Sequence, residues 1–267
     1  MTQGGDRIAS ALAKAAAAGR PAIAAYMTAG YPSRGGLTEL LCAVSAACDV
    51  VEVGIPFSDP MADGVTIQRS SRIAILGGTT LTFTLEALAT SIPSIAAPVV
   101  LMSYMNPLLA YGVSRVARDA ASAGVCGFVV PDLPLEEQAL LAPHLLAAGI
   151  ALIQMVTPTT PESRLKHVCA VSEGFVYAVT VAGTTGGGLA DSAQIIRYLQ
   201  RVRTSTAHPI LAGFGVRTRD DVAALIPPAD GVVVGSALID AIDRGESPGT
   251  FLSTLLAGFS PSKGAYP

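Results

Sequence analysis

Residues 51–68 read VEVGIPFSDPMADGVTIQ, an apolar run that passes directly into a loop containing Pro, Gly and Asp. The segment 49–54 is β-branched and bounded by Gly and Pro, which is typical of a short strand buried on both faces of a parallel sheet. A carboxylate inside such a strand is costly unless it has a partner or a function. Glu52 is therefore the first candidate for a functional residue.

Apolar, β-rich runs of the same kind recur along the chain and alternate with segments of helical periodicity. An amphipathic segment at 6–18 precedes the first run. Strands are expected at residues 21–28, 49–54, 98–104, 127–132, 150–156, 174–181, 209–214 and 231–236. Eight strand and helix units in about 250 residues predict an α/β fold, a closed (β/α)8 TIM barrel with an extra N-terminal helix.

No linker or low-complexity segment divides the 267 residues. We therefore expect a single TIM-barrel domain over residues 1–267, with an ordered core at about 6–258 and a frayed C-terminal tail. A doubly wound open sheet is the alternative, but the first strand-to-helix turn lacks the Gly-x-Gly-x-x-Gly fingerprint. In a TIM barrel, functional residues lie at the carboxyl ends of the strands.

The composition argues against several classes of protein. The 17 basic residues are scattered and the net charge is -3, so nucleic acid is not an expected partner. The longest uncharged run, 87–114, is broken by prolines, and the N-terminus has no signal-peptide core, so we expect a cytoplasmic protein. No metal site or catalytic triad is expected from the scattered Cys42, Cys48, Cys126, Cys169, His144, His167 and His208.

Glu52 shares one face of its strand with Gly54, because side chains alternate along a strand. We expect the glycine to leave room for a ligand above the carboxyl group. Burial raises a carboxyl pKa, so Glu52 could exchange a proton near neutral pH, as a general acid and base must. A structural ion pair is the alternative, although the sequence has no basic residue between Arg34 and Arg69.

The loop after this strand carries two more carboxylates. Asp63 could be held at the mouth of the site, or its side chain could be the N-cap of the helix that begins nearby. Asp59 lies between Ser58 and Pro60, a pattern that favours a turn residue.

Glycines lie at the ends of the seventh and eighth expected strands, in the segments 212–216 and 233–237. Backbone N–H groups after these two strands often bind phosphate in TIM barrels, since glycine allows close approach and a helix N-terminus favours an anion. Ordinary turn chemistry is the alternative for each segment. Together they predict a small phosphorylated substrate.

The segment 181–188, after the sixth strand, is rich in glycine. It could be a lid that closes over substrate and brings Thr185 and Gly186 to the site, or a plain connector. Tyr177, on the preceding strand, could offer its hydroxyl to a ligand or simply pack.

These motifs resemble the α subunit of tryptophan synthase over nearly the whole chain, from about residue 6 to 256. The resemblance rests on 51–68, 104–107, 131–134, the Gly- and Thr-rich lid, 213–215 and 235–236. It implies a lyase of tryptophan biosynthesis that cleaves indole-3-glycerol phosphate to indole and glyceraldehyde 3-phosphate by a retro-aldol reaction. It also implies an α-β-β-α heterotetramer, with pyridoxal phosphate only in the β subunit and neither cofactor nor metal in this chain.

The resemblance also implies roles for individual residues. Glu52 matches the acid/base that protonates the indole ring, and Asp63 the carboxylate that stabilises positive charge on that ring. Tyr177 matches a third site residue. The implied substrate-binding residues are Met102, Met155, Thr185, Gly186, Phe214, Gly215, Gly235 and Ser236. The implied partner interface contains Asn106, Pro107 and Asp132.

The sequence departs from the family pattern in three places. Val65 stands where the family typically has Pro, Thr184 replaces an apolar lid residue, and 187–188 is Gly-Gly in place of an Ala-Arg type of sequence. These changes leave open a stand-alone lyase that releases free indole, or a noncatalytic activator of a β subunit. Another phosphate-binding barrel lyase or isomerase is a formal alternative that does not explain residues 51–68.

Overall fold

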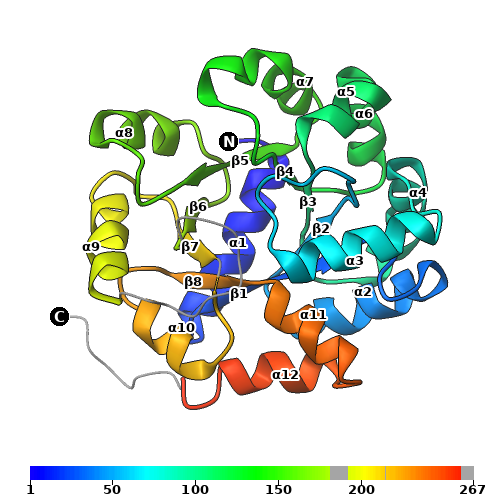
Figure 1. Cartoon of the computed structure of the whole chain (residues 1–267). Coiled ribbons are helices and arrows are strands. Elements are labelled where there is room, and N and C mark those ends of the chain that lie inside the picture. The colour runs from blue at the N-terminus through cyan, green and yellow to red at the C-terminus, as the bar shows by residue number, and fades with distance from the viewer. Residues whose placement is uncertain (181–191, 214, 260–267) are drawn as a thin grey trace.

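The computed structural model describes residues 1–180, 192–213 and 215–259. Eight parallel strands pair in sequence order and close into a barrel, with helices around it (Figure 1). The strands are β1 (Ala22–Thr28), β2 (Val50–Gly54), β3 (Val99–Met102), β4 (Gly127–Val129), β5 (Ala151–Val156), β6 (Val176–Val179), β7 (Ile210–Gly213) and β8 (Gly231–Val234). The predicted TIM barrel is confirmed.

Helices connect the strands and cover the outside of the barrel. The α-helices are α1 (Gln3–Ala17), α2 (Leu37–Ser45), α3 (Val65–Leu76), α4 (Leu81–Ser91), α5 (Met105–Tyr111), α6 (Val113–Ser122), α7 (Ala142–Ala147), α8 (Glu162–Ala170), α9 (Ser192–Arg203), α10 (Arg219–Leu225), α11 (Ser236–Asp243) and α12 (Pro248–Leu255). Short 3-10 helices are η1 (Arg34–Gly36), η2 (Ile92–Ser94) and η3 (Leu135–Leu140).

Several strands end earlier than the sequence predicts. β3 stops at Met102 rather than at residue 104, and β4 stops at Val129 rather than at residue 132. Pro131 has no backbone N–H to continue the ladder, and Tyr104 already serves as the N-cap of α5. The residues at these carboxyl ends therefore belong to loops that can shape a site.

Side chains alternate between two cores along every strand. Outward residues such as Val51 and Val53 pack against the helices, whereas inward residues such as Val50 and Val100 fill the barrel. Glu52 has the same parity as Val50 and pairs in register with Tyr26 of β1. The alternation therefore places the Glu52 carboxyl group inside the barrel.

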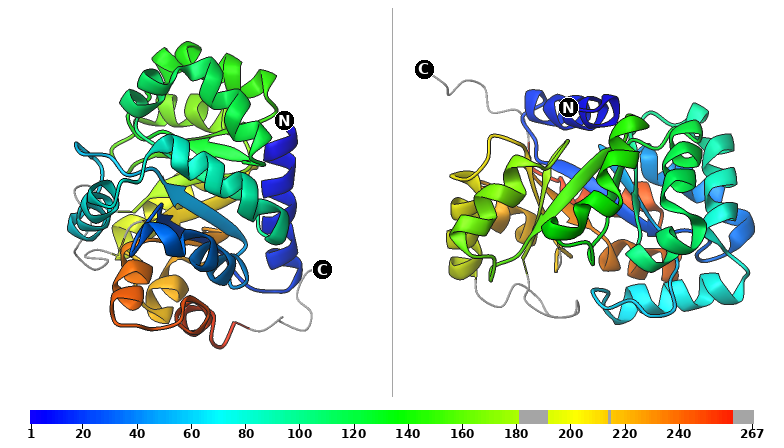
Figure 2. Two further views of the ribbon diagram at one scale, coloured as in Figure 1. Left: turned by 90° about the vertical axis from the view of Figure 1, so that its right-hand side faces the viewer. Right: turned by 90° about the horizontal axis from the view of Figure 1, so that it is seen from above.

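Helix α1 lies across one end of the barrel (Figure 2). Its Ile8 and Leu12 are buried in the same core as the inward side chains of the strands. A Cβ atom at Gly4 would lie 1.9 Å from the carbonyl oxygen of Cys126, so only glycine permits this approach. The helix begins at Gln3, earlier than predicted, because the Thr2 hydroxyl accepts a hydrogen bond from the N–H of Gly5.

Three further features are the apolar character of the helices, the state of the cysteines and the C-terminal tail. Among the described helices none is long and apolar enough to cross a membrane alone, and one bent pair, 65–76 with 81–94, meets the length and composition criteria together. The four cysteines are free thiols, of which Cys126 and Cys169 are buried and Cys42 and Cys48 are partly exposed. The expected frayed tail lies largely outside the described residues.

Candidate active site

A cavity opens at the carboxyl ends of the strands, with about 770 Å³ of empty space including its mouth. This size is typical of a pocket for a small organic ligand. Among the predicted site residues, its lining includes Glu52, Met102, Asp63, Met155, Tyr177, Gly215, Gly235 and Ser236. The predicted lid, 181–188 with Thr185 and Gly186, lies outside the described residues, and so does Phe214.

Glu52 sits inside the barrel with only 4% of its surface exposed. Burial, and secondly the nearby charge of Asp63, raise the pKa of the Glu52 carboxyl group to about 8. No salt bridge in the described part of the chain involves Glu52, so the structural ion pair considered for it is wrong. At neutral pH this carboxyl group is protonated and can donate a proton.

Asp63 lies in the loop between β2 and α3 and is also buried. Burial raises the pKa of its carboxyl group to about 6, and a hydrogen bond from the Tyr104 hydroxyl opposes that rise. The N-cap of α3 is Gly64, without a side-chain capping bond, so the alternative of Asp63 as the N-cap is wrong. The two carboxyl groups thus differ at neutral pH, Glu52 being protonated and Asp63 ionised.

Tyr104 belongs to the motif 104–107 and was not predicted to be a site residue, yet it holds the loop that carries Asp63. Its hydroxyl accepts a hydrogen bond from the N–H of Ala62 at 2.9 Å and donates to the Asp63 carboxylate. Its ring packs against Phe57 with the ring centroids 5.4 Å apart. An aromatic residue just after a strand end, at the rim of a barrel, is the signal that could have identified it.

Glycines inside the barrel make room for tyrosine rings. A Cβ atom at Gly54 would lie 2.1 Å from the Tyr26 hydroxyl, so the space expected for a ligand above Glu52 is filled by Tyr26. Gly213 admits the ring of Tyr177 in the same way, because a Cβ there would lie 2.5 Å from that ring. Burial raises the pKa of both hydroxyls, which therefore stay protonated and can act as donors.

The part of the cavity lining that follows β7 and β8 has the features expected of an anion site. Gly215 has a φ of +85°, a conformation that favours glycine, and Gly235 is the N-cap of α11. Ser236 is the first residue of this helix. Backbone N–H groups at such a helix start point outward without partners in the helix, and its dipole favours negative charge.

The predicted interface residues lie near the rim and outside the cavity lining. Asn106 is exposed in the first turn of α5, and Pro107 is half-buried beside it. The Asp132 carboxylate accepts a hydrogen bond from the N–H of Met105 at 2.8 Å, which joins the loops after β3 and β4. Asp59 is exposed in a bend and accepts a hydrogen bond from the Ser58 hydroxyl, in agreement with a turn role.

Replacing Glu52 by Gln should stabilise the protein increasingly as the pH rises. The pKa of Glu52 is raised from 4.5 to about 8 in the folded chain, so folding takes up a proton between these pH values and wild-type stability falls across this window. The Glu52→Gln advantage should grow by up to about 1.4 kcal/mol per pH unit. Urea unfolding at several pH values measures it, with the exposed Glu86→Gln as control. An advantage independent of pH would contradict the buried protonated state.

Replacing Val65 by Pro should stabilise the start of α3. Val65 is the first residue of this helix and is 76% exposed, and proline at this position needs no N–H and has its φ already set. The free energy of unfolding should rise by about 0.4–1 kcal/mol. Val65→Ala controls for the lost side chain, and Ile73→Pro, inside the same helix, should cost about 3 kcal/mol or more. A loss of stability in Val65→Pro would show that this backbone is not helical at residue 65.

Comparison with known proteins identifies the family of this chain. The family model described as tryptophan synthase alpha chain matches residues 12–257. A tryptophan synthase alpha chain from Bacillus cereus is 47% identical over 199 residues, 74% of this chain and 77% of that protein. Tryptophan synthase from Mycobacterium tuberculosis superposes with a TM-score of 0.88 at 35% identity, covering 95% of this chain and 98% of that one. Tryptophan synthase subunit alpha from Legionella pneumophila gives 0.84 at 30% identity, covering 96% and 97%. The chain therefore belongs to the tryptophan synthase alpha chain family.

Proposed function

We propose that this chain cleaves indole-3-glycerol phosphate to indole and D-glyceraldehyde 3-phosphate, as a lyase of L-tryptophan biosynthesis. The observation that carries this proposal is the pair of buried carboxyl groups, Glu52 and Asp63, that line one cavity in different protonation states. A retro-aldol cleavage needs an acid for the ring carbon and a negative charge beside the ring nitrogen. The two carboxyl groups supply these two requirements.

In the first step the protonated Glu52 gives its proton to the indole carbon that bears the glycerol chain. The ring becomes positively charged, and the ionised Asp63 accepts a hydrogen bond from the ring N–H and stabilises that charge. The carbon–carbon bond then breaks and its electron pair returns to the ring, which yields indole. The glycerol hydroxyl becomes the aldehyde as its proton passes to the Glu52 carboxylate, so Glu52 ends protonated as it began.

The cavity provides an apolar and a polar end for this substrate. Met102 and Met155 line it and would hold the indole ring, while Tyr177 packs beside Glu52 with a protonated hydroxyl. Gly215, Gly235 and Ser236 would bind the phosphate through backbone N–H groups and the α11 N-terminus. We assign Thr185 to contact Asp63, and Gly186 and Phe214 to the phosphate end, from their motifs alone.

The indole would pass to a β subunit of tryptophan synthase in an α-β-β-α heterotetramer. We propose that the partner docks on the face that carries Asn106, Pro107 and Asp132. Two exposed apolar side chains support this placement, Leu109 on the same helix α5 and Met61 in the loop between β2 and α3. Pyridoxal phosphate would be held by the β subunit, and this chain would use no cofactor of its own. We further propose a single domain over the whole chain and a cytoplasmic location.

The stand-alone lyase and the noncatalytic activator are not favoured, because membership of the alpha chain family accounts for both carboxyl groups and the phosphate end. An indole-release assay of the purified chain, with and without a β subunit, separates the three functions. We expect slow release by the chain alone and faster release with the partner. Equal rates would indicate the stand-alone lyase, and no release in either case would indicate the activator.

The pH dependence of cleavage should report both carboxyl groups. Asp63, with a pKa of about 6, must be ionised and Glu52, with a pKa of about 8, must be protonated, so kcat/KM should fall below about pH 6 and above about pH 8. Glu52→Gln should lower kcat by about 100-fold or more, and Asp63→Asn should mainly lower kcat rather than raise KM. Indole release followed from pH 5 to 9 measures these effects.

A Glu52→Gln variant that releases indole at the wild-type rate would remove Glu52 from the mechanism. An unchanged acidic limb in Asp63→Asn would remove Asp63. Val65→Ala is a suitable control at the adjoining start of α3, because the exposed Val65 side chain does not line the cavity.

A further inference from the structure

Arg217 is the one basic side chain among the described residues that line the cavity. It follows Gly215 in the loop between β7 and α10, on the side that we assign to phosphate. The same lining contains the two carboxyl groups Glu52 and Asp63, so a phosphate dianion would add negative charge to a site that already holds an ionised carboxylate. A cation at this position would offset that charge.

The backbone around Arg217 is fixed by the start of α10. The N–H groups of Arg217 and Thr218 both donate to the Asp221 carboxylate, at 2.9 and 2.8 Å, and Thr218 caps the helix in return. The backbone N–H of Arg217 is therefore already used. Any contribution of Arg217 to anion binding therefore comes from its guanidinium group. The side chain that carries this group extends from a fixed backbone position.

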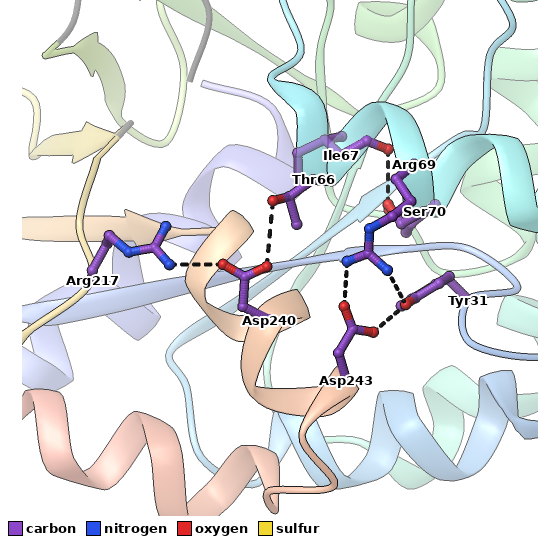
Figure 3. A network of polar contacts seen from close by, with 9 residues as sticks. Tyr31, Thr66, Ile67, Arg69, Ser70, Arg217, Asp240 and Asp243 are labelled. Carbon is purple, nitrogen blue, oxygen red and sulfur yellow. Dashed lines mark hydrogen bonds and ion pairs between the residues drawn. The ribbon is translucent and has the colours of Figure 1, made fainter. Parts of the chain in front are cut away.

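The guanidinium group is held beside the α11 N-terminus by an acidic partner. Its Nη2 donates to Oδ2 of Asp240 at 2.8 Å, and the Thr66 hydroxyl donates to Oδ1 of the same carboxylate at 3.3 Å (Figure 3). Asp240 lies one helical turn after Ser236. Thr66 lies three residues after Asp63, so this carboxylate joins the phosphate side of the cavity to the helix that follows the Asp63 loop.

A second anion can replace Asp240 as the partner of Arg217 at little cost in free energy. The two side chains are 46% and 25% exposed, and ion pairs in such positions contribute only about 0–1 kcal/mol. A phosphate dianion can accept two parallel hydrogen bonds from a guanidinium group, whereas Asp240 accepts one from Arg217. The group has five N–H donors. Among the described residues the side-chain acceptor that it contacts is Asp240, through Nη2, so it can share its donors between both anions.

We propose that Arg217 binds the phosphate group of the substrate with its side chain, and that Asp240 holds the guanidinium group ready at the rim. This inference rests on the proposed function, because it takes the substrate to be phosphorylated. It adds a charged side chain to a phosphate site otherwise built from glycine backbone and a helix N-terminus.

A neighbouring ion pair provides a matched control. Arg69 of α3 pairs with Asp243 of α11 and also donates to the Tyr31 hydroxyl, as Figure 3 shows. It therefore joins α3 to α11, as the Asp240 carboxylate does when it accepts from Thr66. Arg69, Asp243 and Tyr31 do not line the cavity. If the Arg217 ion pair served only to tie its segment to α11, Arg69→Ala and Arg217→Ala should have equal effects.

The test measures binding of glycerol 3-phosphate by calorimetry, together with kinetics on indole-3-glycerol phosphate and on the same compound without its phosphate. Arg217→Ala and Arg217→Gln should weaken glycerol 3-phosphate binding and raise KM by roughly 10- to 100-fold, with a smaller change in kcat. The penalty should vanish for the phosphate-free compound. Arg69→Ala should change KM by less than about fivefold, and Asp240→Asn should bind the anion at least as well as wild type.

Unchanged anion affinity in folded Arg217→Ala and Arg217→Gln would overturn the inference. So would an equal loss in Arg69→Ala or Asp240→Asn, or an equal penalty on the phosphate-free compound. The inference and the proposed function can fail separately. A wild-type chain that binds glycerol 3-phosphate through Arg217 yet cleaves no indole-3-glycerol phosphate, even with a β subunit, would contradict the proposed function alone.

Discussion

The burial of one carboxyl group inside the barrel is the constraint on which the site depends. Glu52 has no ion-pair partner in the described structure, so the cost of burial falls on its ionised form and raises its pKa to about 8. The rings of Tyr26 and Tyr177 pack around it where Gly54 and Gly213 leave space, and α1 closes the other end of the barrel. Burial of Glu52 costs stability, but it also keeps the carboxyl group protonated at neutral pH, so that it can donate a proton.

The second carboxyl group differs because a loop, rather than a strand, carries it. Asp63 is also buried, but Tyr104 donates a hydrogen bond to it and lowers the pKa that burial alone would give. Tyr104 simultaneously binds the N–H of Ala62, so one side chain both places the loop and adjusts its charge. Val65, the exposed first residue of α3, follows this loop and does not line the cavity.

Sequence periodicity was sufficient for the features that depend on local pattern. The β-branched runs predicted the eight strands, and the period of two predicted that Glu52 and Val50 share a face. Features that depend on register between distant strands were missed or wrong. Tyr26 fills the space at Gly54 because β1 and β2 pair at this register, and Tyr104 reaches Ala62 from a different loop. The Arg217–Asp240 pair likewise joins the loop after β7 to the helix after β8, which the pairing of these two strands brings together.

The central claim is that Glu52 and Asp63 lie in one cavity with different protonation states at neutral pH. A ¹³C NMR titration of the side-chain carboxyl carbons tests it most directly, with Glu52→Gln and Asp63→Asn used to assign the two signals. The account predicts that the Glu52 signal titrates near pH 8 and the Asp63 signal near pH 6. Two signals that both titrate below about pH 5, as ordinary carboxyl groups do, would contradict it.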